Sequence, residues 1–497
     1  MSTIQSLNAD SAWPIYDREG VRALEALLQA KNPNRLMAQA GLATAQLALS
    51  IAPHAQRIGV AAGPGHNGGD GLEAAMHLHR WGKKVCVSLM GSVDQLPSDA
   101  HAAWQRALSA GVPMAHGLPN HGLQDWGPHD LIIDALLGIG AMRPLTKEMM
   151  AWVQAINHAR APVLAVDLPT GLNSDSGQFL GPSAASFCIQ ADHTLTFIAP
   201  KPGLFMGHGR DMCGQIWLAS LGATASTNGP QPHAWLNPMR PHPIKTHASH
   251  KGNYGDVAVI GGEADEHGWG MTGAALLAAT SALHAGAGRV ILSLLCGQSS
   301  NTATADLMQR DWQSLDLEHL HVVCGCGGGA SVKQVLPAVL QRAKQLVLDA
   351  DGLNVLSQTP ALQALLRQRA NSQATVITPH PLEAARLLQT HTSEVQNNRL
   401  EAAQNLMALL QCTVVLKGSG TIIASPGQTP RINTSGNGLL AVGGTGDVLA
   451  GLIGARMAQG LTAFDAACTA VAEHGHVADH WPAGQALTAS RLARRLR

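Results

Sequence analysis

Short runs of apolar residues alternate with helix-forming stretches along most of this chain, and this alternation restricts the possible folds more than any single motif. Residues 163–166 (VLAV) and 414–416 (VVL) are typical of the runs, because they are short and contain no polar residue. Strands that are apolar on both faces belong to parallel sheets covered by helices on both sides. We therefore predict an α/β fold built from doubly wound sheets.

A polar stretch divides this pattern into two halves. Residues 223–250 are rich in Pro, Ser, Thr, Asn and His and show no apolar periodicity, which is typical of a domain boundary. We predict a first domain over residues 1–222 with a three-layer, Rossmann-like arrangement, a linker over 223–245, and a second domain over 246–497.

Composition and charge exclude several classes of protein. Hydrophobic residues make up 45% of the chain, which argues against disorder. Lys plus Arg and Asp plus Glu both total 33, so we expect neither a nucleic-acid partner nor a polybasic membrane surface. No apolar run is long enough for a membrane helix, and the first residues do not have the pattern of a secretory signal. The scattered cysteines form no CxxC pair, so we expect reduced thiols and a cytoplasmic protein.

The first glycine-rich loop, GPGHNGGDG over residues 63–71, follows an apolar run and leads into a helix. In such a loop backbone N–H groups and a helix N-terminus can approach phosphates. The loop contains GxGxxG, but no acid stands at the end of the next strand to hold a ribose, so we do not expect a Rossmann dinucleotide site. A glycine turn without a ligand is the alternative, although it has no need of the polar Asn67 and Asp70.

Two further predicted strands end in polar residues. Asp134 follows residues 131–133, and Asp167 and Thr170 follow residues 163–166. Because the carboxyl ends of parallel strands lie at one edge of the sheet, Asn67, Asp134, Asp167 and Thr170 can converge there. Carboxylate, amide and hydroxyl oxygens suit a hard cation, and an aspartate without a cation can act as an acid and base. An aspartate that only caps a helix is the alternative for each of the two acids.

The second glycine-rich loop precedes a strongly helical run. Residues 443–447 read GGTGD, and the helix is predicted from about residue 448 onward. N–H groups and the helix dipole at such a turn stabilise a phosphate, and Asp447 is placed to take a proton from an attacking hydroxyl. An N-cap aspartate in a tight turn is the alternative. GxxxxGK[ST] is absent, which argues against a P-loop nucleotide site.

The first half resembles the NAD(P)H-hydrate epimerase family. The resemblance covers about residues 15–220 and rests on GPGHNGGDG (63–71), DALLGIG (134–140), DLPTG (167–171) and LMAQAG (36–41). It implies inversion at C6 of the hydrated nicotinamide ring with Asp167 as acid and base, and potassium held by Asn67, Asp134 and Thr170. The implied substrate-binding residues are Asp167 and those of two loops: His66, Asn67, Gly68, Gly69 and Asp70, then Gly138, Ile139, Gly140, Ala141, Met142, Arg143 and Pro144.

Two residues depart from that family's pattern. His66 stands where the family has the first Asn of a pair, which affects substrate contact more than the cation site. Thr170 stands where the family has Ser and keeps the hydroxyl.

The second half resembles the ADP-dependent NAD(P)H-hydrate dehydratase family, which has a ribokinase-like fold. The resemblance covers about residues 245–495 and rests on the order of GGTGD (443–447), LDADGLN (348–354), TPHPLE (378–383) and LKGSGT (416–421). It implies that ADP phosphorylates the C6 hydroxyl of the S hydrate and that phosphate is then eliminated, which yields NAD(P)H, AMP and inorganic phosphate. Magnesium is implied as the bridging ion, with Glu383 as an indirect ligand.

The resemblance also implies roles for individual residues in the second half. Asp447 is the base that deprotonates the hydroxyl and contacts the substrate. The hydrate pocket is lined by Ala274, Gly327 or Gly329, and His380. The nucleotide is held by Lys417, Gly418, Ser419, Gly420, Thr421, Gly443, Gly444, Thr445 and Gly446. Cys326 and Gly328 replace the usual Pro and Leu of the loop after one strand, so a more mobile loop is expected there.

We therefore expect a homo-oligomeric repair enzyme that acts on hydrated NADH and NADPH (NADHX and NADPHX) and uses K⁺, Mg²⁺ and ADP. Two alternatives stay open. One is a dehydratase whose first domain only binds ligand, and the other is a ribokinase-like kinase for a vitamin precursor.

Overall fold

The computed structural model describes residues 4–7, 11–31, 35–118, 123, 125–181, 187–223, 229–240, 245–264, 270–295, 305–370 and 373–496. The chain divides into two compact units, Met1–Asn8 with Trp13–Ala234, and Ala9–Ala12 with Trp235–Arg497. The division falls within the expected linker, of which residues 224–228 and 241–244 lie outside the described residues, as does Cys296. Among the described residues no helix has both the length and the apolar character needed to cross a membrane.

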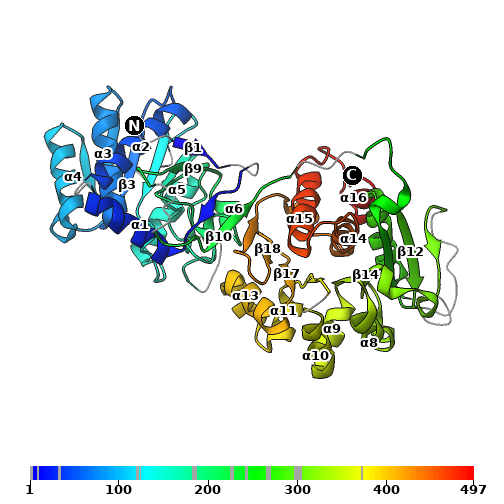
Figure 1. Ribbon diagram of the computed structural model, residues 1–497. Helices are drawn as coiled ribbons and strands as arrows, with labels where there is room; N and C mark the ends of the chain where they lie inside the picture. Colours follow the sequence, from blue (N-terminus) through cyan, green and yellow to red (C-terminus); the bar gives the residue numbers. More distant parts are fainter. Residues whose placement is uncertain are drawn as a thin grey trace. The chain divides into compact units, whose positions relative to one another are not determined.

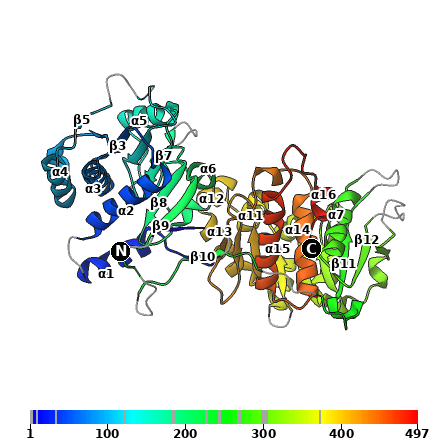
Figure 2. The same ribbon diagram turned by 90° about the horizontal axis from the view of Figure 1, so that it is seen from above.

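The first unit is a sheet with helices on both faces (Figures 1 and 2). Its main elements are β1 (Ile4–Ser6), β2 (Pro14–Ile15), α1 (Arg18–Lys31), α2 (Leu36–Ile51), β3 (Ile58–Ala62), α3 (His66–Arg80), β4 (Val85–Leu89), α4 (Ser98–Ser109), β5 (Met114–His116), β6 (Leu131–Ala135), α5 (Lys147–His158), β7 (Val163–Val166), β8 (His193–Phe197), α6 (Gly209–Met212) and β9 (Gln215–Ala219). The strand order is β1-β9-β8-β7-β6-β3-β4-β5, and β1 alone is antiparallel to its neighbour.

Alternate residues of the central strands point to opposite faces of the sheet and pack into two separate hydrophobic cores. Ile133 and Val166 pack with α1–α4, whereas Ile132 and Ala165 pack with α5 around the buried Trp152. Each central strand is thus buried on both faces, which is why its sequence is apolar throughout.

The second unit repeats this design with a larger sheet. Its main elements are β10 (Ala234–Asn237), β11 (Asp256–Gly261), α7 (Thr272–His284), β12 (Arg289–Leu294), β13 (Met308–Gln309), β14 (His321–Cys324), α8 (Val332–Arg342), β15 (Gln345–Leu348), α9 (Asp351–Gln358), α10 (Pro360–Arg369), β16 (Thr375–Ile377), α11 (Pro381–Leu388), α12 (Thr392–Asn397), α13 (Arg399–Leu410), β17 (Thr413–Leu416), β18 (Ile422–Ala424), β19 (Arg431–Asn433), α14 (Thr445–Ala458), α15 (Ala463–Asp479) and α16 (Ala489–Ala493). The sheet order is β13-β12-β11-β14-β15-β16-β17-β18-β19-β10, with β18 antiparallel to both of its neighbours.

Helices cover both faces of this sheet as well. α7, α14, α15 and α16 share one core with the strands, and α8–α11 and α13 lie on the opposite side in Figure 1. The predicted α/β class with parallel, doubly wound sheets is thus confirmed. Part of the expected linker is a strand, since β10 pairs in parallel with β19 and buries Leu236.

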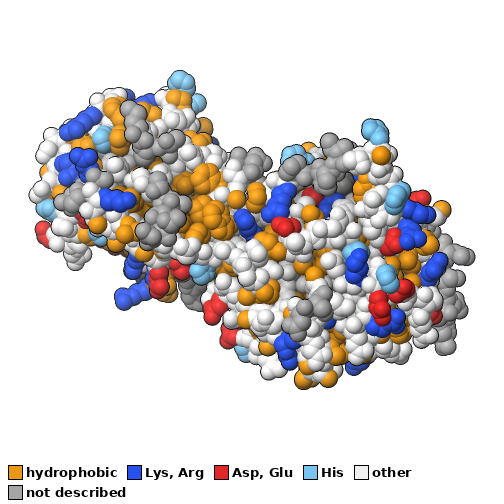
Figure 3. All heavy atoms as spheres, viewed as in Figure 1, with side chains coloured by type: hydrophobic (Ala, Val, Ile, Leu, Met, Phe, Trp, Pro, Cys, Tyr) orange, Lys and Arg blue, Asp and Glu red, His pale blue; other side chains and the backbone are white. Residues whose placement is uncertain are grey.

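The surface agrees with the balanced composition. On the face drawn in Figure 3, basic and acidic side chains are interspersed over both units.

Candidate active sites

The first candidate site lies where the strand order of the first sheet reverses. β3 and β6 are neighbours, and the chain continues from β3 toward β4 and from β6 toward β7, so the loops after β3 and β6 diverge there. Ligands of open α/β sheets bind at such a switch point. The sequence-predicted residues come from the start of α3, from the end of β6 and the loop after it, and from the loop after β7.

Asp134 and Thr170 are in direct contact at this point. Both are fully buried, and the Asp134 carboxylate accepts hydrogen bonds from the Thr170 hydroxyl and the Thr170 backbone N–H, each at 2.8 Å. The Leu136 N–H donates a third bond at 3.2 Å. Burial raises the pKa of Asp134 to about 6, because all three of these partners are neutral and none supplies a positive charge.

Gly138 lies between Asn67 and Asp167. A Cβ at this position would be 3.0 Å from Asn67 Oδ1 and 3.2 Å from Asp167 Oδ2, so both oxygens face the same small space. The Ile139 N–H donates to Asp167 Oδ2 at 3.0 Å. Asn67 Nδ2 is buried and has no hydrogen-bond partner within the described chain, so an acceptor on a bound ligand would satisfy it.

Asp167 is held in an unusual conformation by a buried lysine. Its φ of 68° is left-handed, which only a few per cent of non-glycine residues adopt, and such strain is concentrated at functional sites. Lys201 Nζ donates to Asp167 Oδ1 at 2.5 Å and to Thr196 Oγ1 and the Phe197 carbonyl at 2.8 Å. Sequence reasoning missed Lys201, whose only signal is that it is a lysine in an otherwise apolar run after β8.

The remaining predicted residues of this unit surround the same loops. His66 opens α3, is exposed, and contacts Asp99 at 3.0 Å through Nδ1. Asp70 is half-buried in the first turns of α3, and burial followed by the charge of Asp167 raises its pKa well above the usual range. Gly140 and the 142–144 stretch are exposed at the rim of the site.

The second candidate site occupies the equivalent switch point of the second sheet, between β11 and β14. A Cβ on Gly327 would be 2.8 Å from that of Ala274, so these two predicted pocket residues are neighbours. Gly329 is pinned by Asp351 Oδ2, which accepts from its N–H at 2.9 Å. The loop is further fixed by Glu263, whose carboxylate accepts from Ala330 and Ser331. The loop of residues 325–331 is therefore hydrogen-bonded from two sides, by Asp351 and by Glu263.

Asp447 lies in the first turn of α14, directly after the glycines of the second loop. Gly443 is exposed with open space around it, and Gly444 has a φ of 91° that allows the tight entry into the helix. Asp447 is half-buried, and burial, followed by the charge of Asp349, raises its pKa to about 6. A carboxylate with a pKa of about 6 is ionised at neutral pH. Because this pKa is close to the surrounding pH, the carboxylate can accept a proton during a reaction.

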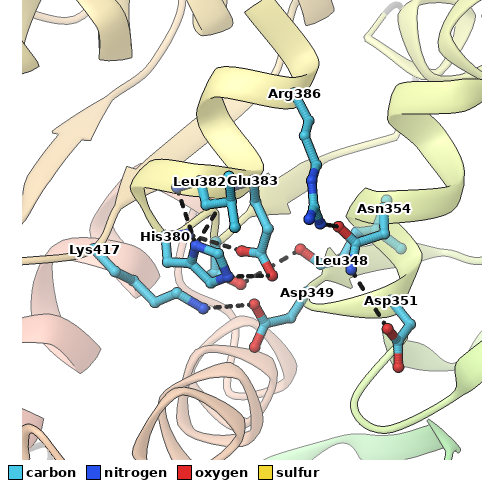
Figure 4. Close-up of polar contacts among 10 residues, drawn as sticks. Leu348, Asp349, Asp351, Asn354, His380, Leu382, Glu383, Arg386 and Lys417 are labelled. Atoms are coloured by element: carbon cyan, nitrogen blue, oxygen red, sulfur yellow. Dashed lines mark hydrogen bonds and ion pairs between the residues drawn. The ribbon is translucent and has the colours of Figure 1, made fainter. Parts of the chain in front are cut away.

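Polar residues that follow β15, β16 and β17 lie close together (Figure 4), and one of them, Asp349, is within 4.8 Å of Asp447. Lys417 Nζ, after β17, donates to Asp349 Oδ1, after β15, at 2.8 Å. A Cβ on Gly446 would be 3.2 Å from Lys417 Nζ, which brings the predicted nucleotide residues of both loops together. Burial lowers the pKa of Lys417, but the carboxylates of Asp349 and Glu383 outweigh it and the pKa is raised.

His380 and Glu383, at the end of β16, form a reciprocal cap on α11. His380 Nδ1 accepts from the Leu382 and Glu383 N–H groups, and Glu383 Oε2 accepts from the His380 N–H at 2.8 Å. Burial raises the pKa of Glu383 to about 7. His380 therefore uses one ring nitrogen for structure, and its other nitrogen lies 3.2 Å from Glu383 Oε1.

Arg399 is a second residue that sequence reasoning missed. Its side chain is buried, with 2% of the residue exposed, and it donates hydrogen bonds to the carbonyls of Leu416, Lys417 and Gly420. These bonds fix the backbone of the loop from Lys417 to Thr421. Gly418 has a φ of 134° and leaves no room for a side chain above the guanidinium.

Comparisons with known proteins identify the class to which these two units belong. Residues 257–496 match the family model described as NAD(P)H-hydrate dehydratase, and residues 33–203 match the one described as YjeF-related protein N-terminus. Among solved structures, the ADP/ATP-dependent NAD(P)H-hydrate dehydratase from Bacillus subtilis is 30% identical over 51% of this chain and 91% of its own, with a TM-score of 0.41.

Curated relatives match over nearly the whole chain. The bifunctional NAD(P)H-hydrate repair enzyme of Escherichia coli is 37% identical, with 89% of this chain and 84% of the relative covered. The enzyme of the same name from Coxiella burnetii is 35% identical, with 94% of both covered. The chain belongs to the family of bifunctional NAD(P)H-hydrate repair enzymes.

Proposed function

We propose that this chain repairs hydrated NADH and NADPH with both of its units. The first unit interconverts the R and S hydrates at C6, and the second uses ADP to dehydrate the S hydrate, releasing NAD(P)H, AMP and phosphate. The observation that carries the proposal is that each sheet presents an aspartate, Asp167 or Asp447, beside a glycine-rich loop at the same edge as its switch point.

In the first unit the substrate's reacting carbon would lie against Asp167. The carboxylate is oriented by two donors: the Ile139 N–H binds Oδ2, and the Lys201 ammonium binds Oδ1. Asp167 would move the proton during inversion, and the N–H groups of the 66–70 loop would bind phosphate. The intact Asp167 and the buried, unpartnered Asn67 Nδ2 favour catalysis over a purely binding role for this unit.

The oxygen atoms of Asp134, Asn67 and Thr170 are suitable ligands for a potassium ion. A buried carboxylate with only neutral partners lacks a counter-charge, and the Asn67 amide and Thr170 hydroxyl add neutral oxygens. Potassium would supply that charge and fix the loops on which Asn67 and Thr170 lie.

In the second unit Asp447 would take the proton of the C6 hydroxyl as the phosphoryl group is transferred. The N–H groups of residues 443–446 would stabilise charge on that group, and Lys417 would bind the nucleotide phosphates. Magnesium fits next to Glu383, since a buried carboxylate with a raised pKa gains a counter-charge from a divalent cation.

The test uses freshly mixed R and S hydrate of NADPH with K⁺, Mg²⁺ and ADP. Chromatography follows both epimers and AMP, while near-ultraviolet absorbance follows NADPH. We expect rapid loss of both epimers with AMP formed. Loss of S alone would demote the first unit to a binding role, and phosphate transfer from ATP to a stable alcohol, without NADPH recovery, would favour the kinase.

Alanine at Gly138 is expected to slow epimerisation roughly tenfold. The new methyl would press on Asn67 Oδ1 and Asp167 Oδ2 and displace the reacting carboxylate, and small misplacements of reacting groups cost about this much or more. Gly127→Ala is the matched control, because nothing lies within 4 Å of its Cβ and Gly127 lies outside the loops of the site. It should alter the rate by no more than about twofold. Equal rates for the two variants would contradict the placement of Asp167.

The dehydratase rate should fall with acid at a higher pH than an ordinary aspartate would cause. Because the pKa of Asp447 is raised to about 6, its basic form is lost as the pH falls through that value. We expect kcat/KM for the S hydrate to drop about tenfold per pH unit below 6. Far-ultraviolet circular dichroism at each pH checks that the fold persists, and a flat profile between pH 7 and 5 would contradict the assignment.

A further inference from the structure

A thiol and two carboxylates from three different elements meet at the start of α14. Cys326 follows β14, Asp349 follows β15, and Asp447 is in the first turn of α14. One ligand atom from each residue lies within 4.8 Å of the other two. Cys326 and Asp349 are buried, whereas Asp447 is half-buried, so the cluster is open only on the side of Asp447.

Backbone hydrogen bonds fix the position of the thiol. The Gly262 N–H donates to the Cys326 carbonyl at 3.0 Å, and the Gly325 N–H donates to the Ile260 carbonyl at 3.0 Å. The Asp349 N–H donates to the Cys324 carbonyl at 3.1 Å, which ties the two ligand-bearing strand ends together. The backbone segments that carry Cys326 and Asp349 are therefore held together before any ligand arrives.

The cluster is short of positive charge. Lys417 forms an ion pair with Asp349 at 2.8 Å, and its charge is also attracted by the carboxylate of Glu383. A divalent cation among the three groups would supply the missing positive charge and would promote loss of the thiol proton.

The donor set selects among divalent cations. A thiolate with two carboxylates suits Zn²⁺, which takes sulfur and oxygen ligands in a tetrahedron, whereas Mg²⁺ takes oxygen in an octahedron. We propose that Cys326, Asp349 and Asp447 form a zinc site whose fourth position is open on the side of Asp447, and that zinc bound there inhibits the dehydratase. The Zn–S bond forms as the thiol proton passes to solvent, and the metal occupies the Asp447 oxygen that would accept the substrate proton.

The inhibitory half of this proposal rests on the proposed role of Asp447, but the metal site does not. Cys326→Ala, which removes the thiol and leaves both carboxylates in place, is the first variant. Cys326→Ser, which removes only the soft ligand, is the second variant.

The experiment titrates the full-length protein with Zn²⁺ and, separately, with Co²⁺. We expect the wild type to bind one equivalent of zinc with loss of S-hydrate dehydration but not of epimerisation. Co²⁺ should give the thiolate-to-metal charge-transfer absorption, and both variants should bind zinc at least about tenfold more weakly. The cobalt spectrum needs neither a variant nor an active enzyme.

Absence of the charge-transfer absorption, or equal zinc affinity and inhibition in the wild type and Cys326→Ser, would overturn the proposal. Failure of the proposed function would show itself separately, as missing NADPH recovery in zinc-free buffer. Zinc that binds with a cobalt thiolate spectrum but leaves dehydration intact would retain the site and refute the inhibition.

Discussion

Asparagine at position 447 is expected to lower NAD(P)H recovery from the S hydrate by about 10²–10⁴-fold, the range typical of losing a general base. The amide keeps the size of the carboxylate but cannot accept the hydroxyl proton. R and S hydrates should still interconvert at the wild-type rate, because Asp447 belongs to the second unit. Single-turnover recovery of NADPH, with chromatography of both epimers, measures the two rates in one sample.

Asp465→Asn is the matched control for this prediction. Asp465 lies in the first turn of α15, as Asp447 lies in the first turn of α14. Its carboxylate accepts a hydrogen bond from the Thr462 hydroxyl at the helix start and forms an ion pair with Arg240. We expect it to change the dehydratase rate by no more than about twofold. If Asp447→Asn retained more than a tenth of the activity, Asp447 would not be the base and the acceptor would have to be sought among its neighbours.

The sequence predicted the central strands of both sheets closely. β7 has the predicted bounds, and β17 begins one residue before the predicted run of residues 414–416. These strands are buried on both faces, so their apolar sequence alone indicates them. The edge strand β1 escaped prediction, because it is short and pairs with β9, which is distant in sequence.

The start of α3 shows where local preference misleads. Sequence reasoning placed the helix from about residue 72, because glycines are poor helix formers, but α3 begins at His66. The glycines serve packing instead. A Cβ on Gly68 would lie 2.0 Å from the Gly63 carbonyl, and one on Gly71 would meet Ala135 at 2.6 Å. Tertiary contact therefore outweighs propensity at the phosphate loop.

The same distinction separates the site residues that could be predicted from those that could not. Asp134 lies at the end of β6 and Asp167 directly follows β7, and the rule that parallel strands end at one edge suffices to bring them together. Lys201 instead reaches a site from beyond the next strand, β8, and Arg399 reaches one from the first residue of α13. Only the packed structure shows that each basic side chain turns inward, where Lys201 donates to Asp167 and Arg399 donates to the Leu416 carbonyl.

Methionine at Lys201 is expected to abolish epimerisation nearly as completely as alanine at Asp167, by about 10²–10⁴-fold, and to leave dehydration of the S hydrate unchanged. Lys201 fixes Asp167 Oδ1 at 2.5 Å, and Asp167 has a left-handed φ that its surroundings must maintain. Its side chain is 1% exposed, so removing it leaves a buried carboxylate without a counter-charge. Such a loss costs about 3–5 kcal/mol of the free energy of unfolding.

Stability and activity together separate a role in the reaction from a role in folding. The double variant Asp167→Asn with Lys201→Met removes both charges, so it should regain most of the unfolding free energy lost in Lys201→Met while epimerisation stays absent. Lys147→Met, the same substitution at an exposed position of α5, should leave both properties unchanged. If Lys201→Met epimerised within tenfold of the wild type, the lysine would serve packing alone, and Asp167 would act without a fixed partner.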